Sequence, residues 1–358
     1  MLLKHLVEYD DLEAEKQNIV AKISGLRADS PEDAALLDRI YKILNTGTIG
    51  TNIETALVAP TADENMSEAE LKKHRQAVTK ILSGLDSDYK NLNIFLKKLE
   101  GGGAVDISAL DKPINSLGNI FGNDPIAVKA FTALANYGVG IKQKGPGEFA
   151  LAMLSNKIKL ASGEGDLEVE GIGKVELKAA LSSSGGRIGY GGGSQKAKRS
   201  ILDKYAERIP SVMNAIGGKG GSLGLGNFLK ALNVDLPIND QENRNLRKQI
   251  MDELLTMDME GFTGPVSDAF ANKEDQQSIE KTYLEQNFAW YKNRDDFDAL
   301  LLISFVNLKS SMIKNAQDLT AFRSGGHANA TGISIVPTQA GAGREQWAQL
   351  TLNKAKIK

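Results

Sequence analysis

The chain of 358 residues contains no cysteine and only three histidines. The lack of cysteine excludes disulfides, thiolate zinc sites, iron-sulfur clusters and cysteine nucleophiles. His5, His74 and His327 are far apart and lack the paired spacing of a histidine metal site. Carboxylates are therefore the main candidates for inorganic chemistry, and carboxylates prefer hard cations such as Mg²⁺.

The chain also lacks long apolar runs. No segment approaches the ~18 uninterrupted apolar residues of a transmembrane helix. The first residues, MLLKHLVEYDD, become acidic early and do not form a secretory signal. We therefore expect a protein that has no membrane partner and is located in the cytoplasm.

The chain has no large excess of charge of either sign. It has 43 Lys plus Arg against 45 Asp plus Glu, a net charge of -2. This balance argues against a uniformly basic nucleic-acid-binding protein, although a local basic groove stays compatible with it.

Residues 1–100 have the pattern of an all-helical N-terminal region. Leu36, Leu37, Ile40 and Leu44 follow helical spacing. A second helix is expected to begin with the capping box at residues 67–70 and to end near residue 84. This region has the character of a small bundle or of an arm that packs on a partner, including a second copy of the chain.

The three glycines at 101–103 are the expected linker, because residues without Cβ leave the backbone unrestrained. Residues 104–358 then read as an α/β (α+β) domain with a mixed sheet flanked by helices. The expected helices cover residues 125–137, 148–156, 196–215, 240–259 and 276–293. The apolar runs at 297–306 and 332–336 fit strands, and the first also fits a buried helix.

Alternating apolar and charged residues from 166 to 178 predict a β-hairpin with a turn at Gly171-Ile172-Gly173. Pairing that is symmetric about Ile172 would oppose Glu168 and Glu176. Because strand side chains alternate, one face would be apolar and the other charged. The charged face consists of Asp166, Glu168, Glu170, Lys174, Glu176 and Lys178.

Two interpretations of the charged face are open. It is a solvated surface, which is the common outcome, or its opposed carboxylates share a divalent cation that relieves their repulsion.

The aspartate at 166, followed after about ten residues by Glu176-Leu177-Lys178, resembles the PD-(D/E)xK pattern of the restriction-endonuclease-like nuclease superfamily. That superfamily tends to place a glutamate on a preceding helix, and Glu148 has such a position. The resemblance covers roughly residues 140–200, with the core motif at 145–200. Gly165 stands where the pattern has proline.

The resemblance implies a restriction-endonuclease-like core and hydrolysis of phosphodiester bonds. Asp166 and Glu176, with Glu148 directly or through water, would hold Mg²⁺ or Mn²⁺, and Lys178 would aid the attacking water. Two simpler interpretations stand beside this one. Lys178 would form a salt bridge with Asp166, and Glu148 would be stabilised by the positive end of a helix dipole.

A basic segment follows the hairpin. Residues 187–208 include six basic residues and only two acidic ones, and a glycine-rich stretch precedes most of the basic residues. We expect DNA contacts from Arg187, Lys196, Lys198 and Arg199. A flexible surface loop explains the glycines equally well.

Together, these patterns predict a metal-dependent endonuclease that acts on DNA. The alternative is a non-enzymatic structural or interaction protein of a viral or other large assembly, with or without a vestigial nuclease domain. If the chain is phage-encoded, that alternative would place it in a virion.

Overall fold

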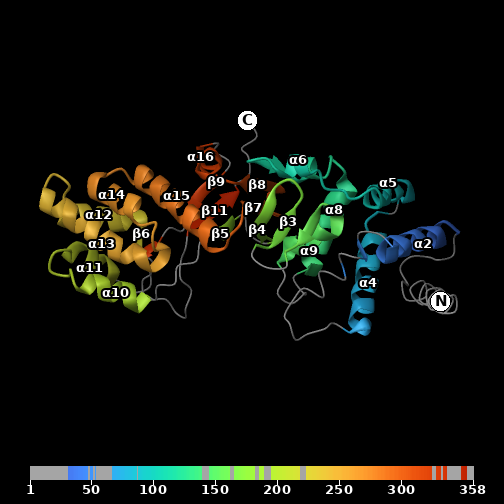
Figure 1. Cartoon of the computed structure of the whole chain (residues 1–358), viewed down its shortest axis with the longest axis horizontal. Helices are drawn as coiled ribbons and strands as arrows, with labels where there is room; N and C mark the ends of the chain where they lie inside the picture. Colours follow the sequence, from blue (N-terminus) through green and yellow to red (C-terminus); the bar gives the residue numbers. More distant parts are fainter. Residues whose placement is uncertain are drawn as a thin grey trace. The chain divides into compact units, whose positions relative to one another are not determined.

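The computed structural model describes residues 31–46, 49–50, 53, 67–86, 88–138, 145–161, 165–181, 185–188, 195–217, 223–324, 328–331, 334–336 and 348–352. The chain forms two compact units, shown with the labels used below in Figure 1. The first unit spans residues 1–183 and 300–312, and the second spans residues 184–299 and 313–358.

The first unit is built around an open, mixed sheet of six strands with the order β1-β8-β7-β4-β3-β2. The strands are β1 (Asn115–Ser116), β2 (Ile158–Leu160), β3 (Leu167–Val169), β4 (Gly173–Ala180), β7 (Ala299–Ser304) and β8 (Lys309–Ile313). The helices of this unit within the described residues are α2 (Pro31–Thr46), α4 (Glu68–Ser83), α5 (Tyr89–Glu100), α6 (Ile107–Leu110), α7 (Leu117–Ile120), α8 (Pro125–Gly138) and α9 (Pro146–Leu154). The expectation of a mixed sheet flanked by helices is confirmed.

Helix α4 has the predicted start and end. The Ser67 side chain accepts the Glu70 N–H at 3.3 Å, and the Glu70 carboxylate accepts the Ser67 N–H at 2.9 Å. This reciprocal capping box satisfies two N–H groups that the helix itself cannot bond. Gly84 caps the other end.

The glycines at 101–103 are not a free linker. The Gly103 N–H donates to the Lys98 carbonyl, and Gly103 forms a β-bridge with Ser155. A Cβ on Gly103 would lie 2.6 Å from the Ser155 Cα, so glycine allows two backbones to approach closely here. The expected boundary at this point therefore lies inside the first unit and does not separate the two units.

The hairpin of β3 and β4 has the predicted faces and a different register. Leu167 pairs with Val175 and Glu168 with Lys174, so the turn is centred on Gly171, whose φ is +79°. The expected Glu168–Glu176 pairing was wrong. The observed register places Glu168 opposite the unlike charge of Lys174. Lys174 is two residues from the expected partner, Glu176, and a shift of two residues keeps each side chain on its expected face.

The apolar face of the hairpin is core, as predicted. Its members are buried: Leu167, Val169, Val175 and Leu177. Helix α9 covers part of this layer by packing on β2 and β4, and α8 packs on α9 (Figure 1).

The second unit is mainly helical. Its helices are α10 (Gln195–Asp203), α11 (Pro210–Gly217), α12 (Leu225–Asp235), α13 (Gln241–Met259), α14 (Gly264–Asn272), α15 (Gln276–Arg294) and α16 (Ala316–Ser324). Two small sheets have the orders β5-β11-β9 and β10-β6. Their strands are β5 (Gly185–Ile188), β6 (Leu223–Gly224), β9 (Ala328–Thr331), β10 (Ser334–Val336) and β11 (Ala348–Leu352).

One helix was expected over 196–215, but the chain forms two, and the second begins at Pro210. Proline has no N–H and suits the first helical position better than an interior one.

A fully buried arginine, Arg247 of α13, holds the second unit together. Its guanidinium donates to the Phe270 carbonyl at 2.7 Å, to the Leu236 carbonyl at 3.0 Å and to Asn233 Oδ1 at 2.8 Å. Burial lowers the pKa of Arg247 to about 10. The carbonyls of Leu236 and Phe270 lie at the ends of α12 and α14, where helices leave acceptors unsatisfied.

No helix within the described ranges combines the length and the apolar character needed to cross a bilayer.

Candidate functional site

Asp166 immediately precedes β3, at the end of the ladder between β3 and β4. Gly165, with a φ of +78°, precedes it, and the Asp166 N–H donates to the Val175 carbonyl at 3.1 Å. The Asp166 carboxylate accepts the backbone N–H of Leu177 at 2.7 Å through Oδ2. The side chain thus acts as the acceptor that a β3 carbonyl would otherwise provide for β4, which fixes it beside the Glu176-Leu177-Lys178 segment.

Glu176 and Lys178 project from the same face of β4, as alternation predicts. Their side chains form an ion pair between Lys178 Nζ and Glu176 Oε1. The Glu176 side chain is 10% exposed and that of Lys178 is 30% exposed. This ion pair lies within one strand, and the simpler expectation of a bridge from Lys178 to Asp166 stays a prediction.

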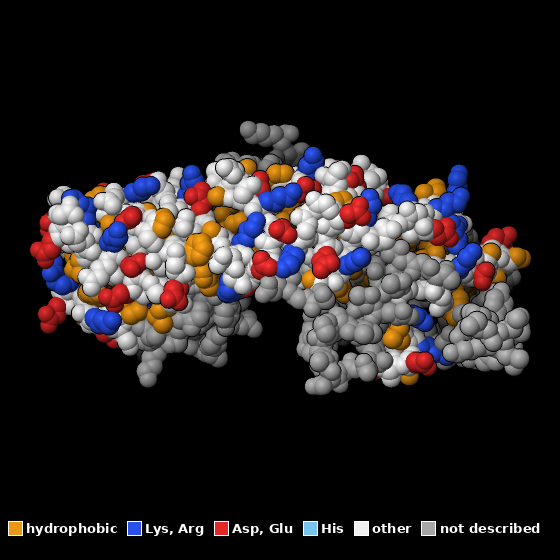
Figure 2. Space-filling model, viewed as in Figure 1, with side chains coloured by type: hydrophobic (Ala, Val, Ile, Leu, Met, Phe, Trp, Pro, Cys, Tyr) orange, Lys and Arg blue, Asp and Glu red, His pale blue; other side chains and the backbone are white. Residues whose placement is uncertain are grey.

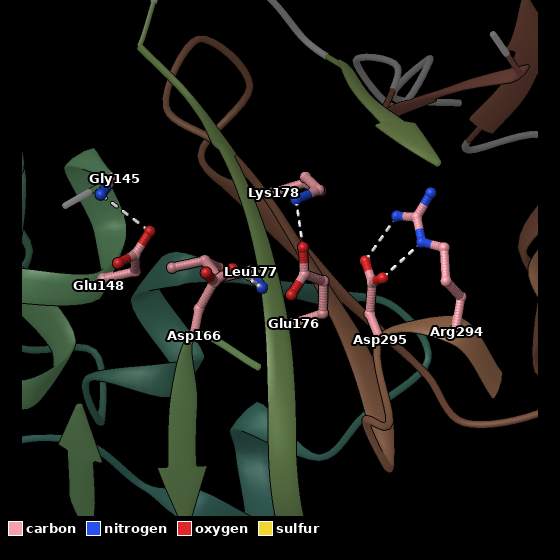
Figure 3. Close-up of polar contacts among 8 residues, drawn as sticks. All are labelled: Gly145, Glu148, Asp166, Glu176, Leu177, Lys178, Arg294 and Asp295. Atoms are coloured by element: carbon pink, nitrogen blue, oxygen red, sulfur yellow. Dashed lines mark hydrogen bonds and ion pairs between the residues drawn. The ribbon is translucent and has the colours of Figure 1, made fainter. Parts of the chain in front are cut away.

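Glu148 is in the first turn of α9 and is buried. Its Oε1 accepts the Gly145 N–H at 2.8 Å. This bond caps the helix start, where N–H groups have no partner within the helix. Figure 3 draws this cap with the Asp166–Leu177 bond and the Glu176–Lys178 pair.

Gly147, which the sequence reading did not single out, determines how closely α9 approaches β4. A Cβ on Gly147 would lie 2.9 Å from Leu177 Cδ2 and 3.0 Å from Ala179 Cβ. Leu177 and Ala179 alternate with Glu176 and Lys178 along β4, so the helix that carries Glu148 packs on the face of the strand opposite to the Glu176–Lys178 pair (Figure 3). In the sequence, a glycine in the first turn of an expected helix was the feature that could have indicated this close packing.

The described residues contain no group of three or more histidine, aspartate or glutamate side chains arranged to hold a metal ion. Carboxylate oxygens are the donors that a hard cation prefers, and the Asp166 carboxylate is bonded to the N–H of Leu177, the residue that follows Glu176. Mg²⁺ commonly takes one or two carboxylates and completes its shell with water and substrate phosphate. A two-carboxylate site is therefore chemically sufficient.

The basic segment after the hairpin is largely neutralised by acidic partners. Lys198 is buried in an ion pair with Asp258 of α13. Arg199 pairs with Asp203 at 3.1 Å within α10. Lys204 and Arg208 pair with two further acids of α13, Glu253 and Glu242.

These pairs change the expectation of DNA contacts. Lys198 is buried and paired, so its position does not suit a phosphate contact, and Arg199 shares its charge with Asp203. Arg187 lies in β5 and Lys196 in α10, and both side chains are outside the described residues. On the face shown in Figure 2, Lys and Arg side chains are interspersed with Asp and Glu.

Comparison of the chain with protein-family models, with curated proteins and with solved structures found no match. The resemblance to the PD-(D/E)xK superfamily therefore rests on the residues of this chain alone and stays a prediction.

Proposed function

We propose that the first unit is a metal-dependent endonuclease with a restriction-endonuclease-like core, which hydrolyses phosphodiester bonds in DNA. The observation that carries the proposal is the hydrogen bond from the Leu177 N–H to Asp166, because it brings the aspartate beside the Glu176-Leu177-Lys178 segment. The helix with Glu148 precedes these strands and packs on β4, in the order that the resemblance implies.

In this proposal Asp166 and Glu176 hold Mg²⁺ or Mn²⁺. When bound, the metal lowers the pKa of a bound water and offsets negative charge on the reacting phosphate. Lys178 stands on the same face as Glu176 and stabilises the charge that develops on the phosphate oxygens. Asp166 is oriented by the Leu177 N–H, and Glu148 fixes the start of α9.

A plasmid-cleavage assay with Mg²⁺ or Mn²⁺ tests the proposal. Wild-type protein should nick or linearise supercoiled DNA, and Asp166→Asn and Lys178→Met should each abolish cleavage. Glu168→Gln is the matched control, because this exposed carboxylate of the same hairpin pairs in register with Lys174 and is not one of the proposed ligands. Cleavage that persists in both site variants, or wild-type protein that neither cleaves DNA nor binds a divalent cation, would refute the proposal.

A non-enzymatic role in a viral or other large assembly is the second candidate. The observation that favours it is the neutralisation of the described basic residues of α10 and its following turn by acids, mostly from α13. Light scattering that shows a stable oligomer, together with calorimetry that shows no divalent-cation binding, would support this candidate over the nuclease. A cation-binding monomer that cleaves DNA would exclude it.

A further inference from the structure

The Glu176 carboxylate has a local positive partner. Its Oε1 is paired with Lys178 Nζ two residues along the same strand. The carboxylate is largely buried, so it is screened less by solvent than an exposed one. Burial of a carboxylate is costly without such a partner, and Lys178 supplies the compensating charge.

The same carboxylate is one of the two proposed metal ligands. The ammonium group and a divalent cation are both positive, and they repel each other when both are held by one carboxylate. The Oδ2 atom of Asp166, the other proposed ligand, accepts the backbone N–H of Leu177, a neutral donor that does not oppose a cation.

We propose that Lys178 and the divalent cation compete for Glu176. In the metal-free protein Lys178 neutralises the carboxylate, and cation binding displaces the ammonium from Oε1. The displaced ammonium, still tethered to β4 on the same face, is then available to a phosphate of the substrate. This inference rests on the proposed nuclease function and adds that metal loading and lysine availability are coupled.

The coupling predicts opposite effects of one substitution on binding and on cleavage. Lys178→Met removes the competing charge and keeps a side chain of similar length. Mn²⁺ affinity should therefore rise about fivefold, the upper range for a partly exposed ion pair, while DNA cleavage is lost. A lysine that helped to hold the metal site together would instead make Mn²⁺ binding weaker when removed.

Isothermal titration calorimetry of the full chain with Mn²⁺, in the absence of DNA, measures the affinity directly. Lys174→Met is the matched control, because Lys174 lies on the same strand and face but pairs in register with Glu168. It should change the affinity by less than about twofold, since any longer-range charge effect is screened by salt. Lys178→Arg keeps the positive charge and should bind Mn²⁺ within about twofold of wild type.

The outcomes separate the inference from the proposed function. Wild-type protein that binds no Mn²⁺ refutes the proposed metal site. Wild-type protein that binds Mn²⁺, with Lys178→Met unchanged or weaker, refutes the competition and leaves the proposed site standing. Circular dichroism of each variant without metal identifies loss of folding. If Lys178→Met is unfolded, Lys178→Arg and Lys178→Gln are titrated with Mn²⁺ instead. Competition then requires the glutamine variant to bind Mn²⁺ more tightly than the arginine variant.

Discussion

The substitution Gly147→Ala tests the packing that brings α9 to β4. The added methyl would lie 2.9 Å from Leu177 Cδ2 and 3.0 Å from Ala179 Cβ, whereas comfortable carbon–carbon contacts are about 3.5–4.0 Å. Leu177 is buried and Ala179 has no side-chain torsion to adjust, so relief requires α9 to move outward.

The expected cost follows from two opposing effects. Overpacking of a close-packed contact destabilises by about 1–3 kcal/mol. Replacement of glycine by alanine in a helix returns at most about 1 kcal/mol. We expect a net loss of about 1–2 kcal/mol, which for a unit of this size lowers Tm by about 2–8 °C.

The assay has to report the first unit separately. Trp290 lies in α15 of the second unit, so its fluorescence, measured in a Trp347→Phe background, follows that unit. Hydrogen exchange of peptides from α9 and β4, measured by mass spectrometry, follows the first unit. Gly147→Ala should speed exchange in these peptides and leave the tryptophan transition unchanged.

Gly118→Ala in α7 is the control within the same unit. Its Cβ would meet Asn123 Oδ1 at 3.4 Å, an ordinary contact, so we expect stability equal to wild type or up to about 1 kcal/mol higher. Equal stability of the Gly147 and Gly118 variants would refute the close approach of α9 to β4, and with it the position given to Glu148.

Three further predictions concern single side chains. Glu148→Gln keeps the acceptor for the helix cap and should preserve both stability and Mn²⁺ affinity. Glu148→Ala removes that acceptor and should lower the free energy of unfolding by about 1 kcal/mol in chemical unfolding. A glutamine variant of normal stability that binds Mn²⁺ poorly would show that Glu148 is a ligand. Burial, with a smaller effect of Lys73, lowers the pKa of His74, which is hydrogen-bonded to Tyr137. The neutral imidazole is therefore favoured in the folded state, so its contribution to stability should be present above about pH 6.5 and decline as the pH falls below that value. The substitution His74→Gln should flatten this decline in thermal melts between pH 5 and 8. An unchanged pH profile of Tm would contradict the assignment. Arg247→Met leaves two helix-end carbonyls without their donor and should destabilise the second unit by about 3 kcal/mol in the tryptophan transition, with exchange in β4 unaffected.

Local patterns predicted much of the fold. The capping box at Ser67 and Glu70 and the glycine at 84 act within one helix, so sequence neighbours suffice to recognise them. The faces of the β3–β4 hairpin also followed from alternation, because a shift of two residues leaves the faces unchanged. The register itself was missed, since Gly171 and Gly173 both permit a turn and the choice depends on cross-strand charge.

The features that sequence reading missed depend on distant partners. The basic segment looked free because Glu253 and Asp258, which neutralise Lys204 and Lys198, follow about fifty to sixty residues later. The glycine at 103 looked flexible because Ser155, the backbone it approaches, belongs to another part of the first unit. No local pattern reports such pairs.

The connection between β4 and β7 has a consequence for how the chain folds during synthesis. These strands are neighbours in one sheet, yet residues 184–298, which belong to the second unit, lie between them in the sequence. A nascent chain that ends at residue 183 contains β1 to β4 but lacks β7 and β8, the two strands that connect β4 to β1. Most of the second unit therefore leaves the ribosome before the first can complete its sheet, and the loop that must close is long, a feature that slows folding.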